Sequence, residues 1–206
     1  MQVQLQNVGK KFASEWIFRG LSFSFEQNAP TVILGSNGSG KSTLLQVISG
    51  SLMEGEGKVI YTSDAHPIEQ EEIYKLLTIA APYLELMEEF TLSESISFHG
   101  QFKAWRNGLT AKDILEISNL SHAKDKQLKN FSSGMKQRVR LLLAILSDTP
   151  LLLLDEPCSN LDPDGCNWYA ELIREHALNR TIIVCSNQVK EEYSFCVKEL
   201  LMESYK

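Results

Sequence analysis

The order of apolar and polar positions divides the chain into alternating, continuous and helical segments. Val3–Val8 and Leu21–Phe25 alternate apolar with polar residues, and Leu21–Phe25 does so strictly. A strand with this period turns one face to a core and the other to water, as is typical of antiparallel sheets. The first part of the chain therefore predicts an antiparallel layer with one solvated face.

Continuous apolar runs form the second type of segment. Thr31–Leu34, Leu151–Leu154 and Thr181–Cys185 are short and uniformly apolar. Runs of this kind are typical of strands buried on both faces of a parallel sheet. Two further strands are expected, at Lys58–Tyr61 after a glycine-rich turn and at Leu77–Ala81.

Between these runs lies a block with the pattern of helices. Thr91 or Ser93 is suited to cap a helix that runs through Phe102, and Thr110 is suited to cap Ala111–Asn119. Because this block separates two stretches of parallel α/β character, we expect it to form an inserted helical lobe.

Two more helices follow in the second half of the chain. Ser132 or Ser133 is expected to open a helix that continues to Leu146. The stretch Leu161–Pro163 begins another, with proline at an early helical position, and this helix is expected to end near Asn179.

The segment Gly35–Ser42 has the spacing of a P-loop, with four residues between its first glycine and Gly-Lys-Ser. A predicted strand precedes it and a predicted helix follows it, so the helix N-terminus lies under the bound phosphates. A chance match in a glycine-rich turn is the alternative, and the flanking elements argue against it. We therefore expect the chain to bind a nucleoside triphosphate, through Gly35, Ser36, Asn37, Gly38, Ser39, Gly40, Lys41, Ser42 and Thr43.

The residue types of this loop match the chemistry of phosphate binding. Glycines let the backbone curl so that successive N–H groups point at phosphate oxygens. Lys41 supplies a positive charge for the β- and γ-phosphates, and the Ser42 hydroxyl is placed to bind Mg²⁺.

Two carboxylates, Asp155 and Glu156, come directly after the apolar run Leu151–Leu154. A strand would carry Asp155 to the carboxyl edge of the sheet beside the P-loop, where it can hold Mg²⁺ through water. Glu156 would then face the attacking water, which suits a catalytic base or a water-orienting residue. Two surface acids are the alternative, but the distance from the P-loop and the following Pro157 favour the site.

Composition narrows the class of protein. The 206 residues are 43% hydrophobic and 22% charged, with a net charge of −6, which disfavours a nucleic-acid-coating surface. The four cysteines show no metal-ligand spacing and are expected to be free thiols. Neither a signal peptide nor an apolar window of about 18 residues is visible, so any membrane part should belong to another chain.

Two further motifs identify the family that the chain resembles. Phe131–Arg138, which contains Ser132-Ser133-Gly134, resembles the signature motif of ATP-binding cassette (ABC) proteins, usually Leu-Ser-Gly-Gly-Gln. Ser159–Asp162 resembles the D-loop that follows the acidic strand. From Val3 to about Tyr193 the sequence is similar to the nucleotide-binding subunit of an ABC transporter, of a compact bacterial type.

The resemblance implies an α/β fold, namely a P-loop NTPase core with a mostly parallel sheet, an N-terminal antiparallel β layer and an inserted α-helical lobe. It implies one cassette over residues 1–206, with a RecA-like core and β layer in about 1–81 and 131–206. The helical lobe would occupy about 82–130.

The resemblance also implies function and partners. Such cassettes dimerise head to tail, so that ATP bound at one P-loop meets the signature motif of the other subunit, here Ser132, Ser133, Gly134 and Met135. The D-loop residues Ser159, Asn160, Leu161 and Asp162 would line the same interface. Phe12 occupies the position of an adenine-stacking aromatic, with Trp16 as its rival and a core role as the alternative for either.

Two positions depart from the family pattern. Asn187 stands where the family has a switch histidine, and an amide can donate a hydrogen bond but cannot carry a proton or a positive charge. We expect Asn187 to lower hydrolysis while binding stays intact; a tolerated substitution is the alternative. Pro82 or Tyr83 stands where the family has a glutamine that touches Mg²⁺, and Gln70 and Gln101 lie too far along the chain to replace it.

The segment Glu85–Phe90 mixes acids with apolar residues in the loop that the resemblance assigns to the membrane subunit. Unpaired acids at a buried interface are costly, which favours a partner helix with basic residues. The alternative is a solvated acidic loop.

The resemblance therefore predicts an ATPase with ATP and Mg²⁺ as ligands, a membrane-spanning transporter subunit as partner, and either a homodimer or a paired second ATPase subunit. We expect a cytoplasmic location, at the cytoplasmic face of the inner (plasma) membrane. An ATP-gated clamp with weak hydrolysis is the first alternative. A soluble ABC protein outside transport is the second, disfavoured by the acidic charge and the lack of a second cassette.

Overall fold

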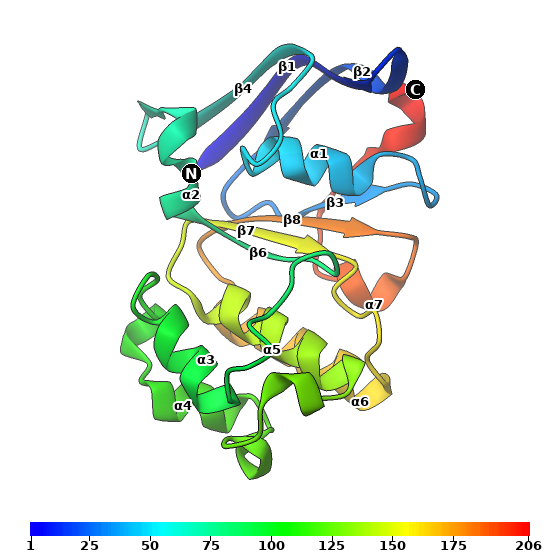
Figure 1. Cartoon of the computed structure of the whole chain (residues 1–206). Helices are drawn as coiled ribbons and strands as arrows, with labels where there is room; N and C mark the ends of the chain where they lie inside the picture. The colour runs from blue at the N-terminus through cyan, green and yellow to red at the C-terminus, as the bar shows by residue number, and fades with distance from the viewer.

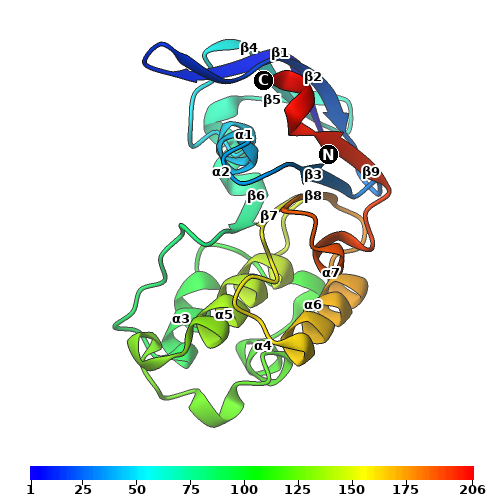
Figure 2. The same cartoon turned by 90° about the vertical axis from the view of Figure 1, so that its right-hand side faces the viewer.

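Four layers are stacked in the molecule: an antiparallel sheet, a helix, a parallel sheet and a group of helices (Figure 1). The structure is a computed structural model that describes all residues from Met1 to Lys206. In the view turned by 90°, helix α1 lies between the two sheets, and helices α3 to α6 lie on the far side of the parallel sheet (Figure 2). This arrangement confirms the predicted fold class.

The antiparallel sheet has the strand order β2-β1-β4-β5. Val3 pairs with Phe25 on one side and with Tyr61 on the other, so the buried positions of three strands stand in register. The first two strands are longer than the sequence pattern predicted, because exposed polar residues continue the hairpin to its tip at Phe12 and Glu15. The strands are β1 (Gln2–Phe12), β2 (Glu15–Phe25), β4 (Glu56–Ser63) and β5 (His66–Ile68).

All strands of the second sheet are parallel, in the order β6-β7-β8-β3-β9. The three continuous apolar runs form its central strands. The edge strand β9 was not predicted, because only one of its four residues is fully buried. The strands are β3 (Thr31–Leu34), β6 (Leu77–Ala80), β7 (Leu151–Asp155), β8 (Thr181–Ser186) and β9 (Lys198–Leu201).

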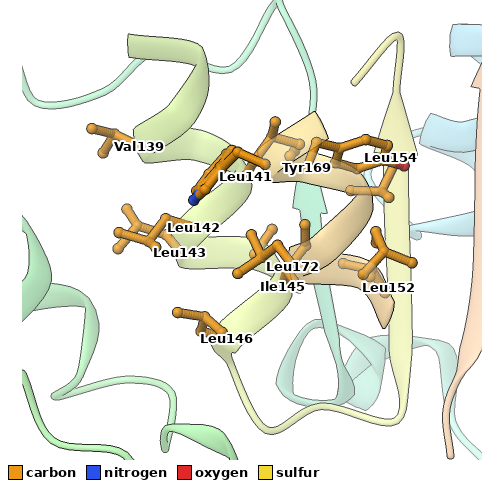
Figure 3. Close-up of a cluster of buried hydrophobic side chains, with 14 of the residues drawn as sticks. Val139, Leu141, Leu142, Leu143, Ile145, Leu146, Leu152, Leu154, Tyr169 and Leu172 are labelled. Atoms are coloured by element: carbon orange, nitrogen blue, oxygen red, sulfur yellow. The ribbon is translucent and has the colours of Figure 1, made fainter. Parts of the chain in front are cut away.

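The two faces of this sheet belong to different hydrophobic cores. Leu152 and Leu154 of β7 point to the core formed with the helices α5 and α6, which Figure 3 shows. Leu151 and Leu153 point the other way, to the core with α1 and the antiparallel sheet. A strand buried on both faces must be apolar at every position, which explains the unbroken leucine run.

The predicted helices are present, and each of the lobe helices begins at its expected cap. Thr91 and Thr110 each accept a hydrogen bond from the third helical residue in a capping box. Three helices, α3, α4 and α6, end two or three residues before the predicted end. Asn119 and Asn179 follow α4 and α6 at positive φ, a conformation that is common just after a helix. The helices are α1 (Lys41–Ile48), α2 (Ile73–Leu76), α3 (Leu92–His99), α4 (Ala111–Ile117), α5 (Ser133–Leu146), α6 (Pro163–His176) and α7 (Lys190–Tyr193).

Helices α3 and α4 lie between β6 and β7 in the chain and pack against each other and against α5. None of the helices combines the length and apolarity that a membrane crossing requires. All four cysteines are free thiols, as predicted.

Candidate functional site

Three of the predicted site segments meet at one edge of the parallel sheet. β3 ends in the P-loop, β7 ends at Asp155, and β8 ends at Ser186 just before Asn187. Asp155 stands opposite Cys185 in the register of β7 and β8. The parallel direction of these strands brings their carboxyl ends together, and ligands of open α/β sheets bind at this edge.

The P-loop turns into α1 at Gly40, the N-cap of the helix, with φ 101°. A Cβ atom at this position would lie 2.7 Å from Cγ2 of Ile17 on β2. Glycine is therefore required twice here, by the backbone angle and by the packing of the loop against the antiparallel sheet. The amides at the start of α1 are directed at the space over the loop.

Lys41 is 95% buried, and its ammonium group donates to the carbonyls of Gly35 (2.8 Å) and Ser36 (3.1 Å). The Lys41 side chain therefore lies along the loop that is expected to bind the phosphates. The Ser36 amide donates to the carboxylate of Glu203, near the end of the chain, over 2.8 Å. No sequence motif indicated that Glu203 holds the loop, because the two residues are 167 positions apart.

Asp155 is 2% exposed, and burial raises the pKa of its carboxyl group, an effect that the nearby Ser42 hydroxyl and Lys41 ammonium oppose. Neither carboxylate oxygen has a well-formed hydrogen bond within the chain. A buried carboxylate beside a hydroxyl fits Mg²⁺, which takes oxygen ligands and keeps several waters. No group of three or more His, Cys, Asp or Glu residues is arranged to hold a metal ion. The protein would therefore supply few of the ligands.

Glu156 has φ 45°, in the left-handed region that side chains larger than asparagine rarely adopt. Its amide donates to the carbonyl of Cys185 over 2.9 Å, which fixes the turn after β7. Strain of this kind is concentrated at functional sites, where the surrounding structure must hold it. It directs Glu156 to a cavity of about 200 Å³ that Asn37, Ser159 and Asn187 also line.

The structure thus brings together residues from the P-loop, the acidic strand and the position of the missing histidine. A further lining residue, Glu192, was not predicted. It is a carboxylate on the short helix α7 and is 2% exposed. The sequence around it, Lys190-Glu191-Glu192-Tyr193, resembles a solvated turn and gave no signal of burial.

Ser132 is the N-cap of α5, and its hydroxyl accepts from the Met135 amide over 3.2 Å. A Cβ atom on Gly134 would lie 2.8 Å from the carbonyl oxygen of Asn160. The segment Ser132–Met135 therefore packs directly on the loop Ser159–Asp162, while none of its residues lines the cavity beside Glu156.

The loop Ser159–Asp162 is ordered at both ends. The Ser159 amide donates to the Glu156 carbonyl over 3.0 Å, and Asp162 is the N-cap of α6 and accepts from the Gly165 amide over 2.8 Å. The buried Ser159 hydroxyl has no partner in the chain. Its free hydrogen-bonding capacity is consistent with a ligand or a second subunit at this loop.

Of the two aromatic candidates for adenine, Phe12 lies at the hairpin tip and is 50% exposed. Trp16 packs against Arg19, whose guanidinium carbon lies 4.6 Å from the ring centroid, and Lys11 lies over the same ring system. Two cations of the chain therefore lie near the Trp16 ring. Phe12 has one cation above it, Lys10 at 5.3 Å.

Tyr83, one of the two candidates for the position of the family's glutamine, lies near Asp155 of the predicted metal site. The residue as a whole is 41% exposed, but its hydroxyl end is partly buried; this burial raises the pKa of the hydroxyl, and the nearby carboxylate of Asp155 adds to the rise. The side chain of Gln46 on α1 interacts with the same hydroxyl. Gln46 lies on the helix that follows the P-loop, and no motif in the sequence indicated that its side chain would reach Tyr83.

The acidic loop is only partly as expected. Glu88 forms an ion pair with Lys136 of α5, so it is not an unpaired acid that awaits a basic partner. Glu85 and Glu89 remain exposed, as do Tyr83 and Met87. The charge argument for a basic partner helix therefore depends on fewer residues than predicted.

The family model described as "ABC transporter" matches residues 18–159, more than half of the chain. The linearmycin resistance ATP-binding protein LnrL of Bacillus subtilis is 27% identical over 198 residues, 94% of this chain and 64% of that protein. A Nod factor export ATP-binding protein I of Bradyrhizobium diazoefficiens is 28% identical over 212 residues, covering 99% of this chain and 68% of that protein. The chain spans about two thirds of the length of these relatives.

Solved structures show the same fold. An ABC transporter ATP-binding protein of Pyrococcus furiosus superimposes with a TM-score of 0.83 at 18% identity, with both chains fully covered. A bacterial ABC transporter cassette solved as a dimer gives a TM-score of 0.79 at 21% identity, covering 97% of this chain and 93% of that one.

Proposed function

This chain belongs to the ABC transporter family, and from that premise we propose that it binds and hydrolyses ATP to drive a separate membrane-spanning subunit. The observation that supports this most is the meeting of the P-loop with Asp155 and Glu156 at one edge of the sheet. Family membership by itself implies ATP binding, whereas hydrolysis requires a residue beside the γ-phosphate that can orient water.

The proposed roles follow from the positions of the side chains. The loop amides and Lys41 bind the phosphates and stabilise the charge that develops during phosphoryl transfer. Ser42 and Asp155 are the residues that would hold Mg²⁺, which when bound neutralises charge on the phosphate oxygens. Glu156 orients and deprotonates the attacking water, and the turn at positive φ holds it in place.

We further propose a head-to-tail dimer, either of two identical chains or of this chain with a second ATPase subunit. The packing of Gly134 on Asn160 supports this arrangement, because it joins the segment Ser132–Met135 to the loop whose Ser159 lines the cavity and has no partner in the chain. In it, Ser132–Met135 would meet the nucleotide of the opposite subunit, and Phe12 would stack on adenine in its own subunit.

The membrane subunit is proposed to dock on the loop at residues 82–90, where Tyr83 and Met87 are exposed. This would place the chain at the cytoplasmic face of the membrane. The relatives named above act in resistance to linearmycin and in Nod factor export, according to their names. The same class of role, ATP supply to a transport system, is what we propose for this chain.

One observation favours a second candidate, a clamp that binds ATP but hydrolyses it slowly. Asn187 lines the cavity where the family has a histidine, and an amide cannot carry a positive charge beside the γ-phosphate. Such a subunit would act as the weaker half of an unequal pair.

Steady-state ATP hydrolysis by the purified protein decides between these candidates. Glu156→Gln is expected to lower kcat by about 100-fold or more while the dissociation constant for ATP stays within about twofold. Activity that survives Glu156→Gln contradicts the assigned role. Undetectable activity in the wild type with tight ATP binding favours the clamp, and absence of ATP binding overturns both.

A further inference from the structure

Glu192 is a buried carboxylate that none of the proposed catalytic roles uses. It is 2% exposed and lies on α7, after the strand that ends beside Asn187. Fully buried acids are rare unless their oxygens are bound, so its position requires an explanation.

The hydrogen bonds of Glu192 join two loops of the nucleotide site. One carboxylate oxygen accepts from the Cys158 amide over 3.1 Å, two residues after Glu156 and one before Ser159. The other forms a short hydrogen bond with the Ser186 hydroxyl, next to Asn187. A single side chain therefore connects the turn that carries Glu156 with the turn that carries Asn187, and all three residues line one cavity.

Ser186 makes this connection sensitive to a proton. Its hydroxyl oxygen accepts from the Val189 amide over 3.2 Å and lies 3.4 Å from the Val189 carbonyl. When Glu192 is ionised, the serine proton points to the carboxylate. When Glu192 is neutral, its own O–H donates to Ser186, and the serine proton turns to Val189. The two protonation states thus impose different hydrogen-bond directions on the residues that bracket Asn187.

The surroundings of Glu192 favour its neutral form. Burial raises the pKa of Glu192 to about 7, the hydrogen bonds from Ser186 and Cys158 oppose this, and Glu156 and Asp155 add to it. The other titratable groups that face it are neutral: Cys158 before α6, Tyr169 on α6 and Cys185 on β8. Both protonation states are therefore populated near neutral pH.

We propose that Glu192 is a positioning residue of the nucleotide site, and that gain or loss of its proton realigns the turns that carry Glu156 and Asn187. In the ionised state both donors, the Cys158 amide and the Ser186 hydroxyl, bind the carboxylate and hold the two turns in a fixed relation. In the neutral state the link to Ser186 reverses, and the alignment for hydrolysis is poorer. The part of this inference that concerns catalysis rests on the proposed function.

The first test follows kcat and KM for ATP between about pH 6 and 8.5 in the wild type, Glu192→Gln and Glu191→Gln. Wild-type kcat is expected to rise about three- to tenfold through a step near pH 7, with little change in KM. Glutamine imitates the neutral acid, so Glu192→Gln should stay at the acidic wild-type level throughout. Glu191→Gln removes an exposed neighbouring carboxylate and should retain the step. Parallel profiles in all three proteins, or a uniform loss at every pH, overturn the inference.

A second test needs neither hydrolysis nor a variant that folds. The side-chain amide signals of Asn187, followed by NMR in the nucleotide-free wild type, should shift with a midpoint near pH 7. No shift between about pH 6 and 8 overturns the inference even if the enzyme is active. If the titration is present but ATP is not hydrolysed at any pH, the proposed function is wrong and the coupling of Glu192 to Asn187 stands.

Discussion

The P-loop and the two turns after β7 and β8 lie at the same edge of the sheet but are stabilised in different ways. Most of the P-loop contacts are close in the chain, because Gly40 adopts φ 101° and Lys41 binds carbonyls five and six residues away, and Glu203 adds one distant contact at the Ser36 amide. The turns that carry Glu156 and Asn187 are joined by Glu192, whose partner Cys158 is 34 residues distant.

This difference decides what each part of the site can tolerate. The predicted phosphate-binding loop is sensitive to single changes in its backbone geometry, because the φ angle and the close packing of its glycine fix its shape. The turns of Glu156 and Asn187 are connected through one buried side chain, and the direction of its hydrogen bond to Ser186 depends on its protonation.

The largest expected effect comes from Gly40→Ala, which breaks the P-loop itself. The new methyl group would meet Ile17 at 2.7 Å and the backbone would keep an unfavourable φ. We expect ATP affinity to fall about 100-fold or more and stability to fall by about 2–4 kcal/mol. Calorimetric binding and thermal unfolding measure the two effects.

Gly20→Ala is the matched control, because Gly20 also has positive φ (66°) but no atom within 4 Å of its Cβ position. Its cost should be limited to about 1 kcal/mol of stability, with ATP affinity unchanged. Equal losses of stability and ATP affinity in both variants would show that backbone strain, and not the contact with β2, causes the effect of Gly40→Ala.

The next prediction concerns the stability of the turns that carry Glu156 and Asn187 as the pH changes. Because burial raises the pKa of Glu192 to about 7, the folded protein holds a proton there that the unfolded chain releases. The free energy of unfolding is therefore not reduced by Glu192 at low pH, where the acid is neutral in both states. It falls as the pH rises from about 4.5 to 7, because the unfolded chain then releases a proton that the folded protein keeps. Chemical denaturation should show the wild type losing about 2–3 kcal/mol relative to Glu192→Gln over this range. A constant difference between the two proteins across that range would contradict the assignment.

A smaller effect on kcat is expected from a change at Gly134, where α5 packs against the loop that follows Glu156. In Gly134→Ala the methyl group would lie 2.8 Å from the carbonyl oxygen of Asn160, a backbone atom that cannot move without shifting the loop Ser159–Asp162. We expect about a tenfold loss of kcat with ATP binding by the isolated subunit unchanged. Measuring the ATP dissociation constant and kcat on the same variant checks this. An equal loss of ATP affinity would contradict the role assigned to Gly134.

The smallest effect sharpens the comparison at Asn187. Asn187→His restores a side chain that can carry charge, in a turn that Ser186 and Glu192 already hold. We expect kcat to rise by about threefold, with the ATP dissociation constant unchanged. Single-turnover hydrolysis measures the change. A decrease would mean that the turn is adapted to the amide.

The sequence by itself determined the fold class, the order of the long helices and central strands, and the strand-loop-helix setting of the predicted P-loop. Each of these depends on short-range rules: two-residue periodicity for strands, capping residues for helices, and glycine where the backbone must curl. Thr91 and Thr110 were found in this way, and so were Asp155 and Glu156 at the end of an apolar run.

Only the tertiary structure decided which distant groups meet. Glu203 binds the Ser36 amide, Gln46 reaches Tyr83 beside Asp155, and Lys136 neutralises Glu88. Glu192 belongs to a short run of charged residues whose pattern predicts exposure to solvent, yet it is buried between two loops. The physical reason is that burial, and with it the pKa of an acid, is set by the packing of elements far apart in the chain, which local pattern does not contain.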